Sequence, residues 1–182
     1  MSLADNSVIA NFVDSNESYH RQMTSFRRTR AAILESSKLL LAKQGYARTS
    51  MIDIADTAEI SRATLYNHFR DKVSVYDALL ESEIARIFSA ARMELTQRGA
   101  LAYLAGEISA DQALAMLRSS DPALFARLYG ITRQLFWAEI QAHMQGLFGP
   151  VGNLALTWLV GQVVQPLESQ QIHAQIELLL PT

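Results

Sequence analysis

The stretch TSMIDIADTAEISRATLYNHFRDK, residues 49–72, predicts two short helices joined by a tight turn. Ser50 with Asp53 three residues later forms a capping box, which satisfies free backbone amides and starts a helix over residues 51–58. Glu59 interrupts this helix, and Ser61 is the N-cap of a second helix over about 62–69. The apolar positions that lock the two helices together are Ile54, Ala55, Ala58, Ile60, Leu65 and Phe69.

The second of these helices leaves a small and polar set of side chains facing outward. They are Arg62, Ala63, Thr64, Tyr66, Asn67 and His68. Their hydrogen-bond donors suit the edges of bases and the phosphate oxygens of DNA. Residues 49–72 are therefore a candidate DNA-reading unit.

Composition limits the class of protein. The chain has 182 residues, nearly half of them apolar, which is enough for one substantial core or two small ones. It has no cysteine, and this excludes disulfides, thiolate catalysis and zinc sites that contain Cys. No run approaches the roughly 20 uninterrupted apolar residues of a membrane helix, and residues 1–23 lack the pattern of a secretory signal. We expect a cytoplasmic protein with no membrane partner.

Charge is distributed unevenly along the chain. The net charge is −2, yet residues 20–72 carry ten Lys or Arg against five Asp or Glu. Residues 73–182 carry six against ten, and the tail before His20 has three acids and no base. This asymmetry is expected of a small DNA-binding head on an acidic body, although a solvated helical surface would give the same pattern.

Apolar residues recur with a period near 3.6 in almost every segment, which predicts an all-α fold. We expect a first helix over about 24–44 that buries Phe26, and a long fourth helix from about 71–73 to Arg98. Further helices are expected over 101–105, 109–118, 121–146, 152–164 and 169–180, and Asp121 followed by Pro122 is a strong helix start.

The predicted division has three parts. Residues 1–23 are an N-terminal tail, either disordered or a short helix with Val8, Ile9, Phe12 and Val13 on one face. Residues 24–72 are a three-helix helix-turn-helix DNA-binding head. Residues 73–182 are a C-terminal helical domain.

The last two predicted helices are candidates for a dimer interface. Residues 152–164 are apolar nearly all round, and residues 169–180 carry one apolar stripe, so the pair can meet its two-fold copy as a four-helix bundle. The alternative is that the pair completes a monomeric core. The candidate interface residues are Leu154, Trp158, Gly161, Val163, Ile172, Ile176 and Leu179.

Several motifs in the head occur in a characteristic order. They are Arg30-Ala-Ala-Ile-Leu, Lys43-Gln-Gly-Tyr, Thr49-Ser50 and Ser61-Arg-Ala-Thr-Leu-Tyr-Asn-His-Phe-Arg-Asp-Lys72. Over about residues 27–80 the chain resembles the TetR/AcrR family of transcriptional regulators. One departure is Glu59, which stands where the family usually has Gly, and a non-Gly residue at positive φ costs roughly 1 kcal/mol. We interpret Glu59 as a tolerated local strain or a slightly altered turn.

The resemblance implies DNA-binding roles for individual side chains. Those assigned to base edges are Arg62, Ala63, Thr64 and Asn67. Those assigned to phosphates are Thr49, Ser50, Tyr66, His68 and Lys72. Leu65 and Phe69 are assigned to the core, and the last two helices to dimerisation.

The resemblance also implies an effector pocket in the body, and plain core packing is the alternative. The candidate lining residues are Phe88, Tyr103, Met116, Phe125, Tyr129, Trp137 and His143. No catalytic residues, metal ligands or cofactors are expected, because the four histidines lie far apart and have no neighbouring nucleophile.

Two hypotheses of function follow. The first is a homodimeric regulator, a repressor, that binds a palindromic operator in double-stranded DNA and is released by a small apolar or amphipathic effector. The alternative is a helical protein-interaction adaptor with architectural or vestigial DNA binding. An enzyme is not expected.

Overall fold

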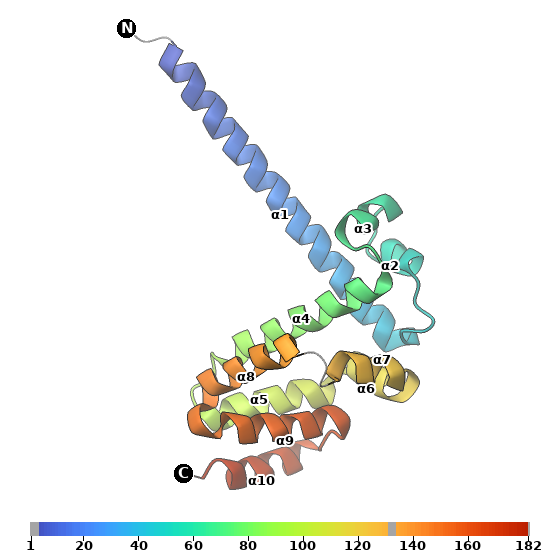
Figure 1. Cartoon of the computed structure of the whole chain (residues 1–182), viewed down its shortest axis with the longest axis vertical. Helices are drawn as coiled ribbons and strands as arrows, with labels where there is room; N and C mark the ends of the chain where they lie inside the picture. Colours follow the sequence, from blue (N-terminus) through green and yellow to red (C-terminus); the bar gives the residue numbers. More distant parts are fainter. Residues whose placement is uncertain (1–3, 131–133, 182) are drawn as a thin grey trace.

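The computed structural model describes residues 4–130 and 134–181, with side chains from residue 19 onward. The described residues form helices and no strand, which confirms the all-α prediction (Figure 1). The elements are α1 (Ala4–Gln44), α2 (Met51–Thr57), α3 (Arg62–His68), α4 (Lys72–Ala91), α5 (Gln97–Ala110), α6 (Gln112–Ser120), α7 (Pro122–Tyr129), α8 (Gln134–Phe148), the 3₁₀ turn η1 (Gly149–Val151), α9 (Gly152–Val164) and α10 (Ser169–Leu179).

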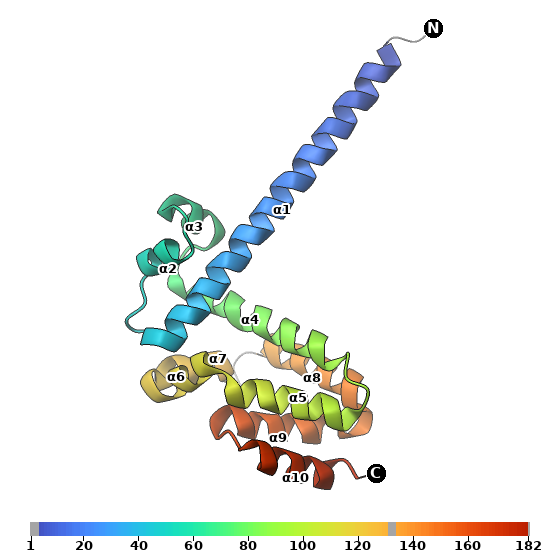
Figure 2. The same ribbon diagram turned by 180° about the vertical axis from the view of Figure 1, so that it is seen from behind.

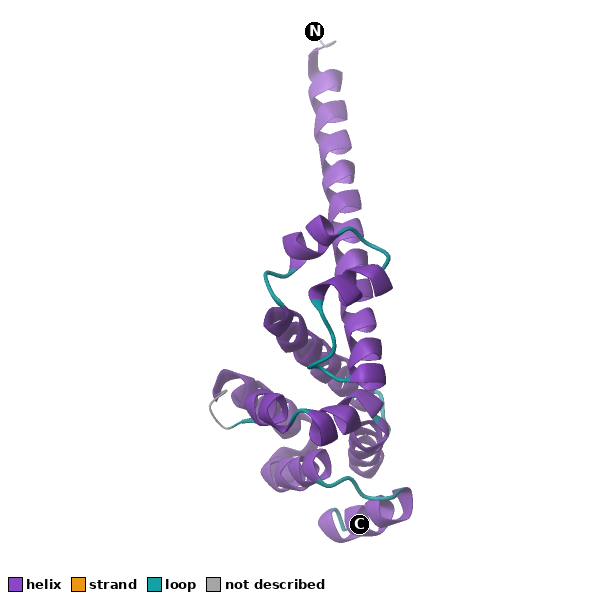
Figure 3. Ribbon diagram, turned by 90° about the vertical axis from the view of Figure 1, so that its right-hand side faces the viewer, coloured by secondary structure: helices purple, strands orange, loops and turns teal. Residues whose placement is uncertain are grey.

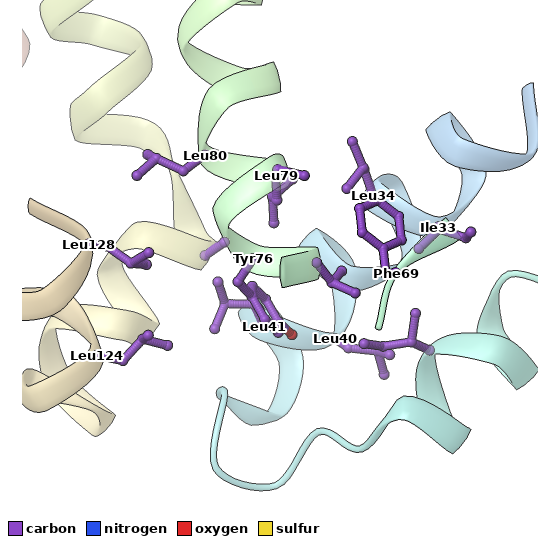
Figure 4. Packing of buried hydrophobic residues seen from close by; sticks show 14 of the residues in the cluster. Ile33, Leu34, Leu40, Leu41, Phe69, Tyr76, Leu79, Leu80, Leu124 and Leu128 are labelled. Atoms are coloured by element: carbon purple, nitrogen blue, oxygen red, sulfur yellow. The ribbon is translucent and has the colours of Figure 1, made fainter. Parts of the chain in front are cut away.

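The head consists of α2 and α3 packed on the C-terminal half of α1 and the start of α4. Ile33, Ile54, Leu65 and Val75 are fully buried at its centre. The same apolar cluster continues through α4 to α6 and α7. Figure 4 shows the side chains of α4 lying between those of α1 and those of α7. The head is thus joined to the rest of the chain by a continuous core.

A second apolar cluster holds the body together. It joins the C-terminal end of α4 to α5, α8, α9 and α10, with Phe88, Leu101, Met144, Phe148 and Ile172 among its buried members. Because Phe88 lies on α4, this helix takes part in both clusters. Helix α4 is therefore the mechanical link between the head and the body.

Two helix boundaries in the body differ from the predictions. Helix α4 ends at Ala91 and not at Arg98, and Thr96 caps a new helix by accepting a hydrogen bond from the Gly99 amide (3.0 Å). Helix α5 then continues through Gly106 as far as Ala110. The break comes at Asp111, whose carboxylate caps α6 through the Leu114 amide (2.9 Å).

The helix predicted over 121–146 is also divided. Asp121 caps its start as expected, with Pro122 at the first position of α7. Helix α7 ends at Tyr129, Gly130 is extended, and α8 begins at Gln134. Residues 131–133 lie outside the described part of the chain.

Helix α1 is longer than the first helix that was predicted. It runs without a break from Ala4, which at about 1.5 Å per residue gives a length of roughly 60 Å. Its N-terminal part projects past α3, away from the body, as all three views show (Figures 1, 2 and 3). Phe26, expected in the core, is 45% exposed because α1 has already left the head core there. The predicted stripe Val8, Ile9, Phe12 and Val13 lies outside the described side chains.

Residues 134–164 are the one described stretch long and apolar enough to suit a membrane span by length and composition. These residues do not form one continuous helix, because η1 separates α8 from α9 and the two helices pack against each other. Gly149 in this turn has φ +55°. A Cβ on Gly152 would meet the Met144 carbonyl oxygen at 2.9 Å, so the close approach of the two helices requires glycine there. The stretch is a helical hairpin within the body.

Candidate nucleic-acid interface

The helix-turn-helix has the caps that the sequence predicts. Ser50 Oγ accepts a hydrogen bond from the Asp53 amide (3.1 Å), and Asp53 accepts one from the Ser50 amide (2.7 Å). Ser61 Oγ accepts from the Thr64 amide (3.0 Å). Glu59 has φ +55°, the left-handed conformation expected for a residue in the place of glycine. This positive φ supports the first of the two interpretations of Glu59, a tolerated local strain.

The outward face of α3 is open. Arg62, Ala63, Tyr66 and Asn67 are exposed, and Leu65 on the opposite face is fully buried. Helix α3 lies on the side of the head that faces away from α8, α9 and α10 (Figures 1 and 3). A rigid helix with small and hydrogen-bonding side chains on its free face can enter the major groove of DNA.

Thr64 is only half-buried and is already engaged within the turn. Its hydroxyl lies 2.8 Å from Ser61 Oγ, and either oxygen can be the donor. To contact a base, the Thr64 hydroxyl must therefore either keep its hydrogen bond to Ser61 and share it with the base, or break that bond.

Thr49 requires a correction. Its side chain is 2% exposed, and its hydroxyl donates a hydrogen bond to the Gly45 carbonyl (2.8 Å). The Thr49 amide in turn donates to the Tyr46 carbonyl (3.1 Å). The residue stabilises the turn after α1 and offers no free donor to a phosphate. Ser50 beside it is exposed.

Lys72 has a structural contact that the sequence did not reveal. Its ammonium donates hydrogen bonds to the carbonyls of Tyr46 (2.9 Å) and Thr49 (2.8 Å) and lies 3.9 Å from the centre of the Tyr46 ring. Burial lowers the pKa of Lys72, although Asp121 and Asp53 oppose the shift. With two of its three protons directed to the turn, Lys72 holds the start of α4 against the α1–α2 connection and has one proton left for a phosphate.

His68 packs against α1 and is not a free surface side chain. Its ring stacks on Phe26 with 4.1 Å between centroids, and the Arg30 guanidinium lies over the neighbouring Phe69 ring at 4.7 Å. Burial, with a smaller effect from Arg30, lowers the pKa of His68. His68 Nδ1 is buried without a hydrogen-bond partner. A neutral ring that carries its proton on Nε2 suits this setting, and Nε2 is then the donor available to a phosphate.

Two small cavities lie beside α4. The inner cavity, of about 90 Å³, is almost wholly apolar, and the predicted effector residues Phe88, Tyr129 and Trp137 line it. The junction cavity, of about 100 Å³, lies between α1, α4, α5, α6 and α7. Both are lined by Ile87, Ile108, Leu114 and Tyr129, which form the partition between them.

The other four predicted effector residues, Tyr103, Met116, Phe125 and His143, lie outside the linings of both cavities, so the structure does not bring them together with the first three. Phe125 packs on Tyr129 with 5.1 Å between ring centroids, and His143 Nδ1 is hydrogen-bonded to Arg92 (2.7 Å). Sequence reasoning missed the charged residues at the junction cavity, because its search for a pocket considered mainly aromatic and Met side chains. They are Lys38, Glu83, Arg86, Glu107 and Asp111.

The predicted dimer residues fall into two groups. On α9, Leu154 is 54% exposed, Gly161 is exposed and Trp158 is half-buried, and these residues with Val164 follow one face of the helix. This set is named the α9 face.

The other predicted interface residues face the body. Ile172 and Ile176 are 4% and 3% exposed, and Leu179 packs on the same cluster. Val163 lines the inner cavity. For Ile172 and Ile176 the assignment to the interface is corrected, because this part of the apolar stripe of α10 is already covered by its own chain.

Comparison with known proteins bears on the head and on the fold separately. Residues 33–79 match the family described as "Bacterial regulatory proteins, tetR family". The HTH-type transcriptional regulator TtgR of Pseudomonas putida is 43% identical over 54 residues, which are 30% of this chain and 26% of TtgR. The HTH-type transcriptional activator FasR of Mycolicibacterium smegmatis is 32% identical over 66 residues, 36% of this chain and 30% of FasR. The chain thus spans about a quarter to a third of the length of these relatives.

The whole fold is similar to that of solved structures. The fatty acid degradation regulator FadR from Bacillus halodurans matches with a TM-score of 0.61 over 83% of this chain and 94% of its own, at 15% identity. At that identity the similarity concerns the fold alone.

Proposed function

Since the chain belongs to the TetR/AcrR family of transcriptional regulators, we propose that it is a homodimeric repressor that binds a palindromic operator and is released by a small molecule. The observation that carries this proposal is the open face of α3, with Arg62, Ala63, Tyr66 and Asn67 exposed on a helix whose other side is locked into the head core. No internal role requires this polar face.

Base reading is assigned to the first turn of α3. A guanidinium at Arg62 can donate two hydrogen bonds to O6 and N7 of a guanine, and Ala63 is small enough to let the helix lie deep in the groove. Asn67 is the next exposed donor one turn later. Ser50, Tyr66 and His68 are placed at the ends of α2 and α3, where phosphate oxygens flank an inserted helix.

The α9 face supports the proposed homodimer. An exposed leucine and a half-buried tryptophan flank Gly161, where a Cβ would meet no atom within 4 Å. A second helix could approach closely there, and two copies related by a two-fold axis would bury each other's α9 faces. Two heads then contact two half-sites, which requires a palindromic operator.

Helix α4 supports the proposed release by an effector. It borders both cavities, and the N-terminal part of α4 packs on α1 and the head. A ligand that enters a cavity and prefers a different position of α4 would change the spacing of the two heads. The adaptor alternative would use the α9 face for a different protein and would leave the open face of α3 without a role. A regulator of this kind would act in the cytoplasm and would need no catalytic site.

Recovery and sequencing of the genomic DNA that the full chain binds in cells tests the proposal. The expected result is a small set of fragments that share an inverted repeat, each footprint covering two half-sites about one helical turn apart or a multiple of it. Transcription from the adjacent promoters should rise when the gene for this chain is deleted. Binding without sequence preference would contradict the proposal, and a fall in transcription on deletion would indicate an activator.

A further inference from the structure

Five charged side chains form an alternating chain of ion pairs at the junction cavity. Lys38 Nζ contacts Glu83 (2.7 Å) and Asp111 (2.9 Å), and Arg86 contacts Glu83 (3.0 Å) and Glu107 (2.7 Å). The order along the chain is therefore Asp111, Lys38, Glu83, Arg86, Glu107, which begins and ends with a carboxylate. The chain carries three carboxylates and two cations.

The two carboxylates at its ends belong to the same short segment. Glu107 lies in the last turn of α5, and Asp111 ends that helix four residues later. This spacing places two side chains next to each other on a helix, about 5–6 Å apart between Cβ atoms, where like charges repel. One more positive charge between Glu107 and Asp111 would close the open chain into a ring of alternating charges.

The open chain of charges borders apolar space. All five side chains line the junction cavity, whose interior is formed by Leu79, Leu80, Leu117 and other apolar residues. The partition of Ile87, Ile108, Leu114 and Tyr129 lines both this cavity and the apolar inner cavity. Together the cavities exceed the roughly 150 Å³ that accommodates a benzene molecule in a protein interior.

We propose that the two cavities form one site for an amphipathic organic cation, whose charged group lies between Glu107 and Asp111 and whose apolar part reaches across the partition into the inner cavity. Among the described residues, no group of three or more His, Asp or Glu side chains is arranged to hold a metal ion, which favours an organic cation. The inference rests on the proposed function only in calling this molecule an effector.

The site lies where an effector would act on the head. Lys38 belongs to α1, and its partners Glu83 and Asp111 belong to α4 and to the α5–α6 corner. Burial alone would lower the pKa of Lys38, but its hydrogen bonds to Glu83 and Asp111 raise it, so the pair contacts persist at neutral pH. A ligand cation that competes for Asp111 would loosen the contact between α1 and the body.

Three probes of equal chain length test the proposal on the full chain without DNA: octylammonium, octan-1-ol and octanoate. Calorimetric titration below micelle-forming concentrations should give the tightest binding for octylammonium, about fivefold weaker binding for octan-1-ol, and the weakest for octanoate. Equal binding of octylammonium and octan-1-ol, or binding of none of the probes, would overturn the proposal.

Two variants, each of which removes one carboxylate charge, test the proposed position of the ligand's cationic group. E107Q should reduce octylammonium affinity about fivefold and leave octan-1-ol unchanged. E94Q, which removes an exposed carboxylate from the connection between α4 and α5, should change neither. An unchanged octylammonium affinity in E107Q would refute the assigned position.

A third variant tests the apolar half of the site. I108F enlarges a side chain in the partition and should weaken all three probes, so unchanged binding of octan-1-ol would overturn the placement of the apolar part. Since binding is measured without DNA, a chain that binds its operator but no probe loses only this inference. A chain that binds octylammonium but no DNA loses the proposed function.

Discussion

Replacement of Lys72 by Met should destabilise the protein in the absence of DNA. The change keeps an aliphatic stem but removes the two hydrogen bonds to the carbonyls of Tyr46 and Thr49 and the contact with the Tyr46 ring. A hydrogen bond from a charged donor contributes about 1.5–3 kcal/mol net, and partial exposure places these two at or below the lower end. We therefore expect a loss of about 2–3 kcal/mol, which for a chain of this size is a drop in Tm of roughly 4–12 °C.

Thermal unfolding followed by circular dichroism measures this effect, and Arg70→Met is the matched control. Arg70 is the neighbouring basic residue, its side chain is 86% exposed, and it contacts only Asp71 among the described residues. The Arg70→Met substitution should change the free energy of unfolding by less than about 0.5 kcal/mol. An unchanged Tm for Lys72→Met, together with weaker DNA binding, would show that Lys72 acts only on phosphates and would refute the structural role.

Three further predictions concern the turn at Glu59, the imidazole of His68 and the α9 face. Glu59→Gly should raise the free energy of unfolding by about 1 kcal/mol in urea titrations, because glycine adopts φ +55° without strain; a loss of stability would contradict this. The pKa of His68 is lowered in the folded chain, so the unfolded chain binds a proton at this residue more readily; the free energy of unfolding should therefore fall as the pH drops through about 6.5 and be unaffected by His68 above it. His68→Gln should remove that part of the loss, and an identical pH profile of stability in the variant and the unchanged protein would refute this. Leu154→Glu should give a folded monomer in light scattering with weakened operator binding, whereas Ile176→Ala should cost about 2–5 kcal/mol of stability and leave a dimer; a dimeric Leu154→Glu variant would exclude the α9 face.

Local capping signals in this chain could be read from the sequence with good accuracy. Ser50 with Asp53, Ser61, and Asp121 with Pro122 each start a helix where predicted, because a cap is a contact between residues three positions apart. The same rule would have found Thr96 and Asp111, which cap the starts of α5 and α6, two helices that were predicted with wrong bounds. The predicted helix ends at Arg98 and at residue 105 each precede a glycine, yet Gly99 and Gly106 both lie inside α5.

Contacts between distant parts of the chain were not predictable in the same way. Lys72 reaches backbone carbonyls 23 and 26 residues away, and nothing local distinguishes it from a free phosphate-binding lysine. The single apolar stripe of α10 could face either its own body or a partner, and periodicity cannot choose between them. Ile172 and Ile176 face the body because α10 packs on α5. Candidate lining residues for the effector pocket could be ranked only by size and apolar character, so three of the seven line a cavity.

The measurement that tests the central claim most directly compares the full chain with its Arg62→Ala variant on its own operator and on random DNA of equal length and salt. Fluorescence anisotropy gives both dissociation constants. If the open face of α3 reads bases, the variant should lose about 1–3 kcal/mol on the operator, roughly 5- to 150-fold in Kd, and almost nothing on random DNA. An equal loss on both DNAs, or no loss on either, would contradict the assignment of α3 as the reading helix.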